Sequence, residues 1–209
     1  MVLIGMFDSP YVRRVAVSMR LLGMGFEHRD WSVGANFDRI REFSPLGRVP
    51  ILVLDDEQVL NESHAILDWL DERAGPERAL LPPRGKQRRI ALQIIGLATG
   101  AADKGVAQLY EVAFRPPEKR HEPWVARCRT QMESALAELD RDCAEAKGEW
   151  LLGERMTQAD ITLTVVSTFL HEALELDPAR YPALARRTAR GEALPAFQAF
   201  HRPFFAPKG

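Results

Sequence analysis

The first part of the chain alternates between short apolar runs and amphipathic stretches, which predicts strands and helices in turn. The apolar run at residues 1–7 predicts a buried strand. After it, apolar residues at 12, 15, 19 and 22 follow the spacing of one helix face, with Ser9 suited to the N-cap and Gly23 to the end. Residues 26–33 alternate well enough for a second strand. A strand, helix and strand within about thirty residues indicate a βαβ unit with parallel strands.

A β-branched apolar run at 47–54 is entered through Pro50, followed by an acidic turn and a second short run ending at Leu60. This pattern predicts an antiparallel hairpin. A proline in a tight turn can be cis and leaves one strand position without a donor, so Val49 could present its N–H and C=O to an extended peptide. A helix over 61–72 follows, with Ser63 as its predicted cap. With a helical or irregular piece near 37–43, the order is β-α-β-α-β-β-α, a mixed four-stranded sheet.

Beyond residue 75 the pattern becomes entirely helical. Prolines and glycines at 75–76 and 82–85 interrupt the chain, which predicts a first domain over 1–75, a linker over 76–85 and an all-helical domain over 86–209. Long helical stripes cover 90–112 and 124–146, and shorter helices are predicted at 177–190 and 195–201. Thr157 and Asp160 form a capping box that predicts the start of a helix running to about Leu174.

Three glycines, Gly96, Gly100 and Gly105, fall inside the first long helical stripe. Each costs roughly 1 kcal/mol relative to alanine in a helix interior. They therefore predict a bend or the close approach of another backbone.

Charge and cysteine content exclude several functions. Lys and Arg number 28 against 29 Asp and Glu, and no basic block stands out, so we expect neither nucleic acid nor a membrane as partner. Cys128 and Cys143 match no metal site or disulfide framework, which suits a reducing cytoplasm. We expect both thiols to be inert.

Taken together, four features occur in a specific order: Val49-Pro50 at the start of the third strand, Glu62-Ser63 at the head of the third helix, a proline-rich linker and Thr-x-x-Asp in a helical domain. This order resembles the glutathione transferases over nearly the whole chain. The resemblance implies a thioredoxin-like first domain, glutathione as co-substrate, no metal and a homodimer. Ser-Pro-Tyr-Val-Arg-Arg-Val at 9–15 is similar to the serine-type tau, zeta and theta-like classes.

The resemblance gives Ser9 the catalytic role of holding the glutathione sulfur as thiolate. The hydroxyl and the positive end of the helix behind Pro10 would lower the thiol pKa, which is roughly 8.5 for a free cysteine. Taken alone, a Ser-Pro before a helix indicates only an N-cap. Tyr11 is the competing hydroxyl donor, because tyrosine fills this role in other classes.

The same resemblance places the glutathione-binding residues. Val49, kept free by Pro50, is expected to pair its main chain with the cysteinyl part. Glu62 is expected to take the γ-glutamyl ammonium, and Ser63 with the helix N-terminus the α-carboxylate. Arg48 could reach the glycyl carboxylate or remain a solvated charge.

The electrophile pocket is expected between the domains, near residues 7–11 and on the long helices. The candidates there are Asp103, Tyr110, Phe114 and Trp124, although side chains at such spacing more often pack in a core or interface. The first domain has no cysteine, which disfavours thiol reductase chemistry. The leading hypothesis is therefore conjugation of glutathione to a small, mostly apolar electrophile, as in detoxification.

Two alternatives remain open. The first is zeta-like isomerisation with glutathione as cofactor, which ranks lower because the zeta signature has Ser-Ser-Cys where this chain has Ser9-Pro10-Tyr11. The second is a non-enzymatic interaction module on the same fold. Such relatives typically lose the glutathione contacts, whereas this chain keeps the motif residues.

Overall fold

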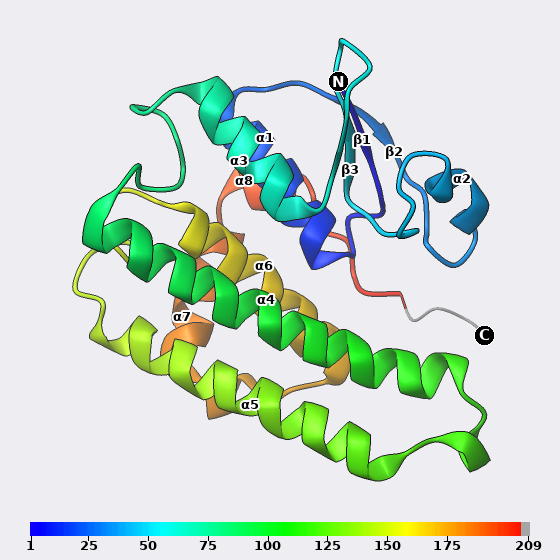
Figure 1. The fold of residues 1–209 in the computed structure, drawn as a ribbon. Helices are drawn as coiled ribbons and strands as arrows, with labels where there is room; N and C mark the ends of the chain where they lie inside the picture. Colours follow the sequence, from blue (N-terminus) through cyan, green and yellow to red (C-terminus); the bar gives the residue numbers. More distant parts are fainter. Residues whose placement is uncertain (206–209) are drawn as a thin grey trace.

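The structure, a computed structural model, describes residues 1–205 and comprises a small sheet domain followed by a bundle of helices (Figure 1). The first part contains β1 (Val2–Ile4), α1 (Pro10–Leu22), β2 (Glu27–Arg29), α2 (Phe37–Arg41), β3 (Ile51–Val53), β4 (Val59–Asn61) and α3 (Ser63–Ala74). The second contains α4 (Gly85–Phe114), α5 (Glu122–Glu145), α6 (Gln158–Leu174), α7 (Pro182–Glu192) and α8 (Pro195–Gln198), with short 3-10 turns at 117–119 and 178–180.

The four strands form one mixed sheet in the order β2-β1-β3-β4. Strands β1 and β2 run parallel, whereas β3 pairs antiparallel with both β1 and β4. The predicted βαβ unit, the hairpin and the mixed sheet are thus confirmed.

Strand β2 is shorter than the predicted 26–33, because the chain turns away from the sheet after Arg29. The main-chain N–H of Trp31 donates to the carbonyl of Arg29 at 2.9 Å. Trp31 and Val33 then pack on the small cluster around Ile40 of α2 instead of extending the ladder. The alternation that predicted a longer strand reflects packing under α2.

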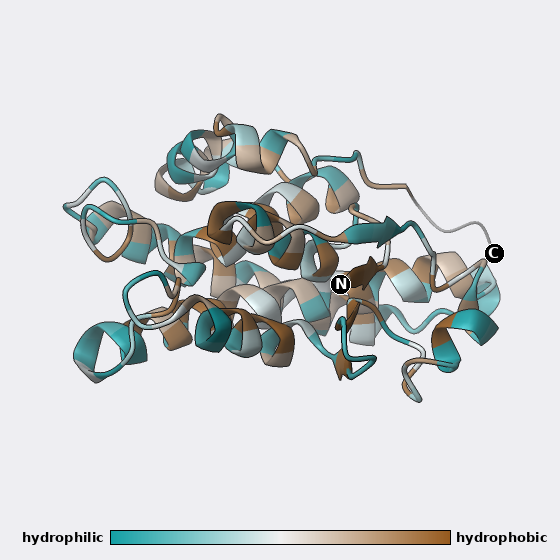
Figure 2. Cartoon of the chain, turned by 90° about the horizontal axis from the view of Figure 1, so that it is seen from above, coloured by the Kyte–Doolittle hydropathy of each residue, from teal (hydrophilic) through white to brown (hydrophobic). Residues whose placement is uncertain are grey.

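Alternating residues of the central strands face two different cores. Leu3 and Leu52 belong to the main core with α1 and α3, whereas Ile4 and Ile51 pack with Ile40 of α2 on the opposite face. The sheet is therefore covered on both faces (Figure 1). Figure 2 shows that hydrophobic residues concentrate in the interior strands and helices, while the outer helices carry hydrophilic residues on their solvent sides.

In the helical part, α4 and α5 form a long pair of neighbouring helices, and α6 packs between α4 and α1 (Figure 1). The capping box of α6 is confirmed: the Thr157 and Asp160 side chains each bond the other's main chain. A Cβ built on Gly105 would lie 2.4 Å from Leu170 Cδ2, so the predicted close approach is real there, although its neighbour is a side chain. At Gly96 and Gly100, such a Cβ would have no atom from outside its own stretch of helix within 4 Å among residues 1–205.

Three helix predictions need correction. Ser63 is the first residue of α3, not its cap, because Glu62 occupies the N-cap position without a side-chain cap bond. The predicted helix over 177–190 is a 3-10 turn followed by α7, since Tyr181 before Pro182 has non-helical φ −135° and ψ 66°. The last helix, α8, ends at Gln198 and not at 201.

Both cysteines are buried as free thiols. Burial raises the pKa of Cys143 to about 12. Within residues 1–205, no helix is both long enough and apolar enough to cross a membrane.

Candidate functional site

Ser9 stands at the N-cap of α1, where the loop after β1 enters the helix. Its carbonyl accepts the main-chain N–H of Arg13 at 2.9 Å, as an N-cap should. Its hydroxyl makes no capping bond, and the residue is only partly buried. The side chain is therefore available beside the positive end of a thirteen-residue helix.

Tyr11 lies in the first turn of α1 and points at the helical domain. Its hydroxyl donates a hydrogen bond to the Asp103 carboxylate of α4. Burial raises the pKa of Tyr11, and the Asp103 carboxylate raises it further. A phenol in this position stays protonated and already has an acceptor, so it is a poor donor for a thiolate.

Val49 comes just before β3, the strand that pairs with β1 on the side away from β2. It lies close to Gly5, which follows β1. The Val49–Pro50 peptide bond is cis. A Cβ on Gly5, whose φ is +132°, would lie 2.9 Å from Val49 Cβ. Strand β3 begins only at Ile51, and Val49 makes no main-chain hydrogen bond with the residues that the structure describes. The N–H and C=O of Val49 thus remain unpaired at the edge of the site.

Glu62 and Arg48 face each other at the head of α3. Arg48 Nη1 lies 3.5 Å from Glu62 Oε1, and both side chains are partly exposed. Glu62 has a positive φ of 69°, a conformation that costs about 1–3 kcal/mol in a non-glycine residue. Strained backbone thus places Glu62 next to the N-terminus of α3, with its carboxylate near Arg48.

Ser63 is buried, and its hydroxyl has an unforeseen partner. Arg14 of α1 donates from Nη2 to Ser63 Oγ at 2.7 Å. The sequence analysis did not single out Arg14. A signal was present in the sequence, because Arg13 and Arg14 are flanked by the apolar residues 12 and 15–17, which leaves this part of the helix little polar surface.

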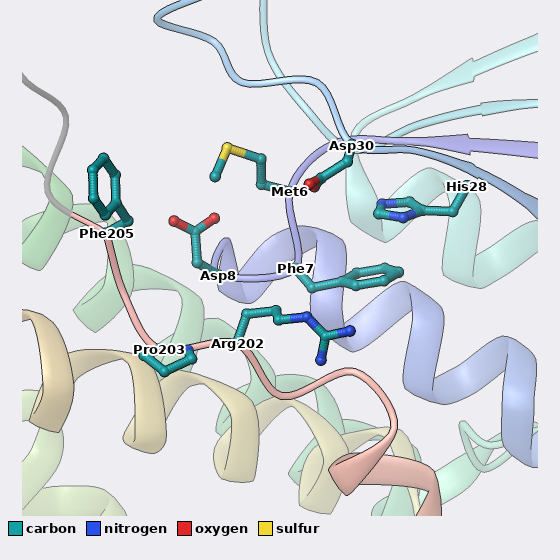
Figure 3. Close-up of a pocket in the computed structure, with 8 residues that line it drawn as sticks. All are labelled: Met6, Phe7, Asp8, His28, Asp30, Arg202, Pro203 and Phe205. Carbon is teal, nitrogen blue, oxygen red and sulfur yellow. The ribbon is translucent and has the colours of Figure 1, made fainter.

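A cavity of about 250 Å³ opens beside the loop that leads to Ser9 (Figure 3). It is lined by Met6, Phe7, Asp8, His28, Asp30, Arg202, Pro203 and Phe205. Phe7 stacks on the His28 ring with 3.9 Å between centroids, which forms one wall. Burial raises the pKa of Asp8, and the Asp30 carboxylate adds to this, although a hydrogen bond from the Phe205 main chain opposes the rise.

The segment after α8 forms the opposite wall of this cavity (Figure 3). Glu172 of α6 contacts His201 Nε2 at 2.7 Å and accepts the main-chain N–H of Phe204 at 3.2 Å. Phe204 also packs edge-to-face on Phe169. These contacts hold residues 201–204 against α6, where the segment passes the loop that carries Asp8.

The four candidates on the long helices do not line this cavity. Asp103 is engaged by Tyr11, while Tyr110 and Phe114 pack edge-to-face and remain 42% and 50% exposed. Trp124 is exposed with Lys104 over its ring at 5.5 Å. Burial raises the pKa of Tyr110, and the charges of Arg48 and Asp8 act on it in opposite directions.

Known families match both parts of the chain. Residues 3–78 match the glutathione S-transferase N-terminal domain and residues 122–186 the C-terminal domain. A solved glutathione S-transferase from Methylobacterium radiotolerans, in complex with glutathione sulfonate, is 32% identical over 100% of this chain and 95% of its own, with a TM-score of 0.87. The chain belongs to the glutathione S-transferase family.

Curated relatives extend over most of the chain. A probable maleylacetoacetate isomerase of Vibrio cholerae is 27% identical, covering 94% of this chain and 93% of its own length. Glutathione S-transferase Z1 of Arabidopsis thaliana is 29% identical, covering 91% and 86%. Membership of the glutathione S-transferase family confirms the resemblance inferred from the motifs and the two-part fold.

Proposed function

We propose that this transferase holds glutathione as its thiolate at Ser9 and adds it to a small, mostly apolar electrophile. The observation that carries the proposal is the Ser9 hydroxyl at the positive end of α1, which makes no capping bond and has no hydrogen-bond partner among residues 1–205. A thiol with a pKa of roughly 8.5 is only a few per cent ionised at neutral pH. A donated hydroxyl and a helix N-terminus both favour the anion, so the nucleophile is present at neutral pH without a base.

The binding residues would divide glutathione between them. The unpaired main chain of Val49, next to Pro50, suits the extended cysteinyl part. The Glu62 carboxylate suits the γ-glutamyl ammonium, and the Ser63 hydroxyl with the N-terminus of α3 suits the α-carboxylate. Arg48 is near enough to Glu62 to be shared between that carboxylate and the glycyl carboxylate of the ligand.

The first domain, 1–75, would bind glutathione. The helical domain, 86–209, would contribute the electrophile pocket, and residues 76–85 would link the two domains. The cavity has aromatic walls, since Phe7, His28 and Phe205 line it. It lies beside the loop that immediately precedes Ser9. We assign the electrophile to this cavity. We further propose that the protein is a homodimer and works in the cytoplasm.

Glutathione-dependent isomerisation at the same site is the second candidate. It is favoured by the similarity to the Vibrio cholerae protein, named a probable maleylacetoacetate isomerase. Against it stands Ser9-Pro10-Tyr11 in place of Ser-Ser-Cys. A role as a non-enzymatic interaction module would leave the Ser9 hydroxyl and the Val49 main chain without a use.

The test is calorimetry of glutathione binding at neutral pH with thiolate absorbance read in the ultraviolet. We expect the unmodified protein to bind at millimolar concentration or below with a depressed thiol pKa. Ser9→Ala should bind glutathione nearly as well but lose the thiolate band, and its kcat should fall about 100-fold, as when one preorganised donor to a developing anion is removed.

Tyr11→Phe is the matched control, since it removes the competing hydroxyl from the same helix turn. It should keep the thiolate band, because Tyr11 donates to Asp103. Loss of the band in Tyr11→Phe but not in Ser9→Ala would transfer the role to Tyr11. Absence of glutathione binding in the unmodified protein would favour the interaction module.

A further inference from the structure

Arg14 is a buried cation without a carboxylate partner among residues 1–205. Only 2% of the residue is exposed, yet its guanidinium contacts two hydroxyls: Ser63 Oγ at 2.7 Å and Thr162 Oγ1 at 3.4 Å. Its Nε is buried and has no hydrogen-bond partner in the part of the chain that the structure describes. Arg13, the adjacent residue, differs sharply: it forms two hydrogen bonds to the Glu192 carboxylate.

An unpaired charge of this kind is costly to bury, which is the reason to ask what it does. Burial lowers the pKa of Arg14 to about 10, so the guanidinium remains charged at neutral pH. The carboxylates of Glu62 and Asp103 support the charge only from a distance. The site around α3 therefore holds a fixed positive charge that lacks an anion in direct contact.

The hydrogen bond to Ser63 fixes what that hydroxyl can do. A guanidinium can only donate, so Arg14 occupies a lone pair of Ser63 Oγ and leaves the Ser63 proton to be donated elsewhere. The main-chain N–H groups at the start of α3 are donors as well. Hydroxyl, helix N-terminus and buried guanidinium all favour an anion at the same place.

We propose that Arg14 is a positioning residue for glutathione: it acts through Ser63 to hold the α-carboxylate at the γ-glutamyl end. This inference rests on the proposed glutathione site. It makes Arg14 a determinant of glutathione affinity that never touches the ligand and has no part in ionising the thiol, which lies at Ser9.

The test compares glutathione with an analogue in which 4-aminobutyrate replaces the γ-glutamyl residue, so that the ammonium stays and only the α-carboxylate is lost. Kd by calorimetry and KM and kcat with one electrophile are measured for both thiols in the unmodified protein, Arg14→Met and Ser63→Ala. Arg14→Met should weaken glutathione about tenfold or more, the usual effect of losing support for a charged hydrogen bond. The analogue's Kd should change less than about twofold, and kcat and the thiolate band should be unchanged for both thiols.

Arg14→Lys and Ser63→Ala keep the proposal testable if Arg14→Met does not fold, as judged by circular dichroism and thermal midpoint. Lys keeps the charge and should restore part of the preference for glutathione over the analogue, whereas Ser63→Ala should lose that preference with Arg14 still in place. Equal weakening of both thiols in the folded variants would overturn the inference and leave Arg14 purely structural. If the unmodified protein binds neither thiol, the proposed glutathione site itself fails, and the inference fails with it.

Discussion

Two glycines of α4 meet different surroundings although they lie on the same helix. A Cβ at Gly105 would lie 2.4 Å from the buried Leu170 side chain, whereas one at Gly100 would have no neighbour within 4 Å from elsewhere in the part of the chain that the structure describes. We expect Gly105→Ala to lower the free energy of unfolding by about 1–2 kcal/mol, because overpacking outweighs the gain in helix propensity. Gly100→Ala should instead raise it by about 0.5–1 kcal/mol.

Urea titration of both variants checks this pair. Equal stabilisation by both substitutions would show that Leu170 yields easily to a methyl group. A loss of stability in Gly100→Ala relative to the unmodified protein that disappears on dilution would show that a second copy of the chain approaches α4 there.

At the scale of elements, the start of α6 depends on one carboxylate. Asp160 accepts hydrogen bonds at 2.8 Å from the main-chain N–H groups of Leu151 and Thr157 and from the Thr157 hydroxyl. Asp160→Asn exchanges one acceptor oxygen for a donor, which should lower the free energy of unfolding by about 2 kcal/mol. Asp177→Asn, at an exposed 3-10 turn where one such bond is made, is the matched control and should change little. Thermal midpoints of the two variants should therefore separate clearly.

Elements whose signals are local could be predicted from the sequence. The capping box at Thr157 and Asp160 is contained in four residues, and the hairpin around Pro50 in about a dozen, so periodicity and turn residues were sufficient. The order of Ser9, Val49, Glu62 and Ser63 predicted a family whose two domain models both match.

Features that depend on contacts between distant segments could not be predicted in this way. From the residues around it in the sequence, Ser63 resembled a helix cap. Those residues carry no sign that Arg14 reaches its hydroxyl from another helix. The cavity wall at Phe205 and the loop residue Asp8 lie at opposite ends of the chain. No periodicity relates them, so only the folded structure brings them together.

At the scale of the whole molecule, Arg13 joins the two domains. Its guanidinium forms two hydrogen bonds to Glu192 of α7 and donates to the carbonyl of Phe197 in α8 at 3.1 Å. Arg13→Met would leave Glu192 with the Thr168 hydroxyl as its remaining partner. We expect this variant to lose about 3 kcal/mol of stability, because breaking a largely buried ion pair strands its second charge.

Unfolding in urea, followed by tryptophan fluorescence and by circular dichroism, tests this joint role. The two curves should coincide in the unmodified chain, and Arg13→Met should shift both to lower urea. Arg180→Met, which breaks the surface pair with Glu133, is the control and should leave the curves in place. A shift in only one of the two curves would mean that the domains unfold independently.

The two buried thiols bear on how the chain would withstand the electrophile of the proposed reaction. Electrophiles that react with a glutathione thiolate also alkylate exposed protein cysteines, but only in the ionised form. Cys128 has no exposed surface, and Cys143, with a pKa raised to about 12, is essentially never ionised at neutral pH. Self-inactivation by alkylation is therefore blocked by burial, and iodoacetamide should label the native chain only after it unfolds.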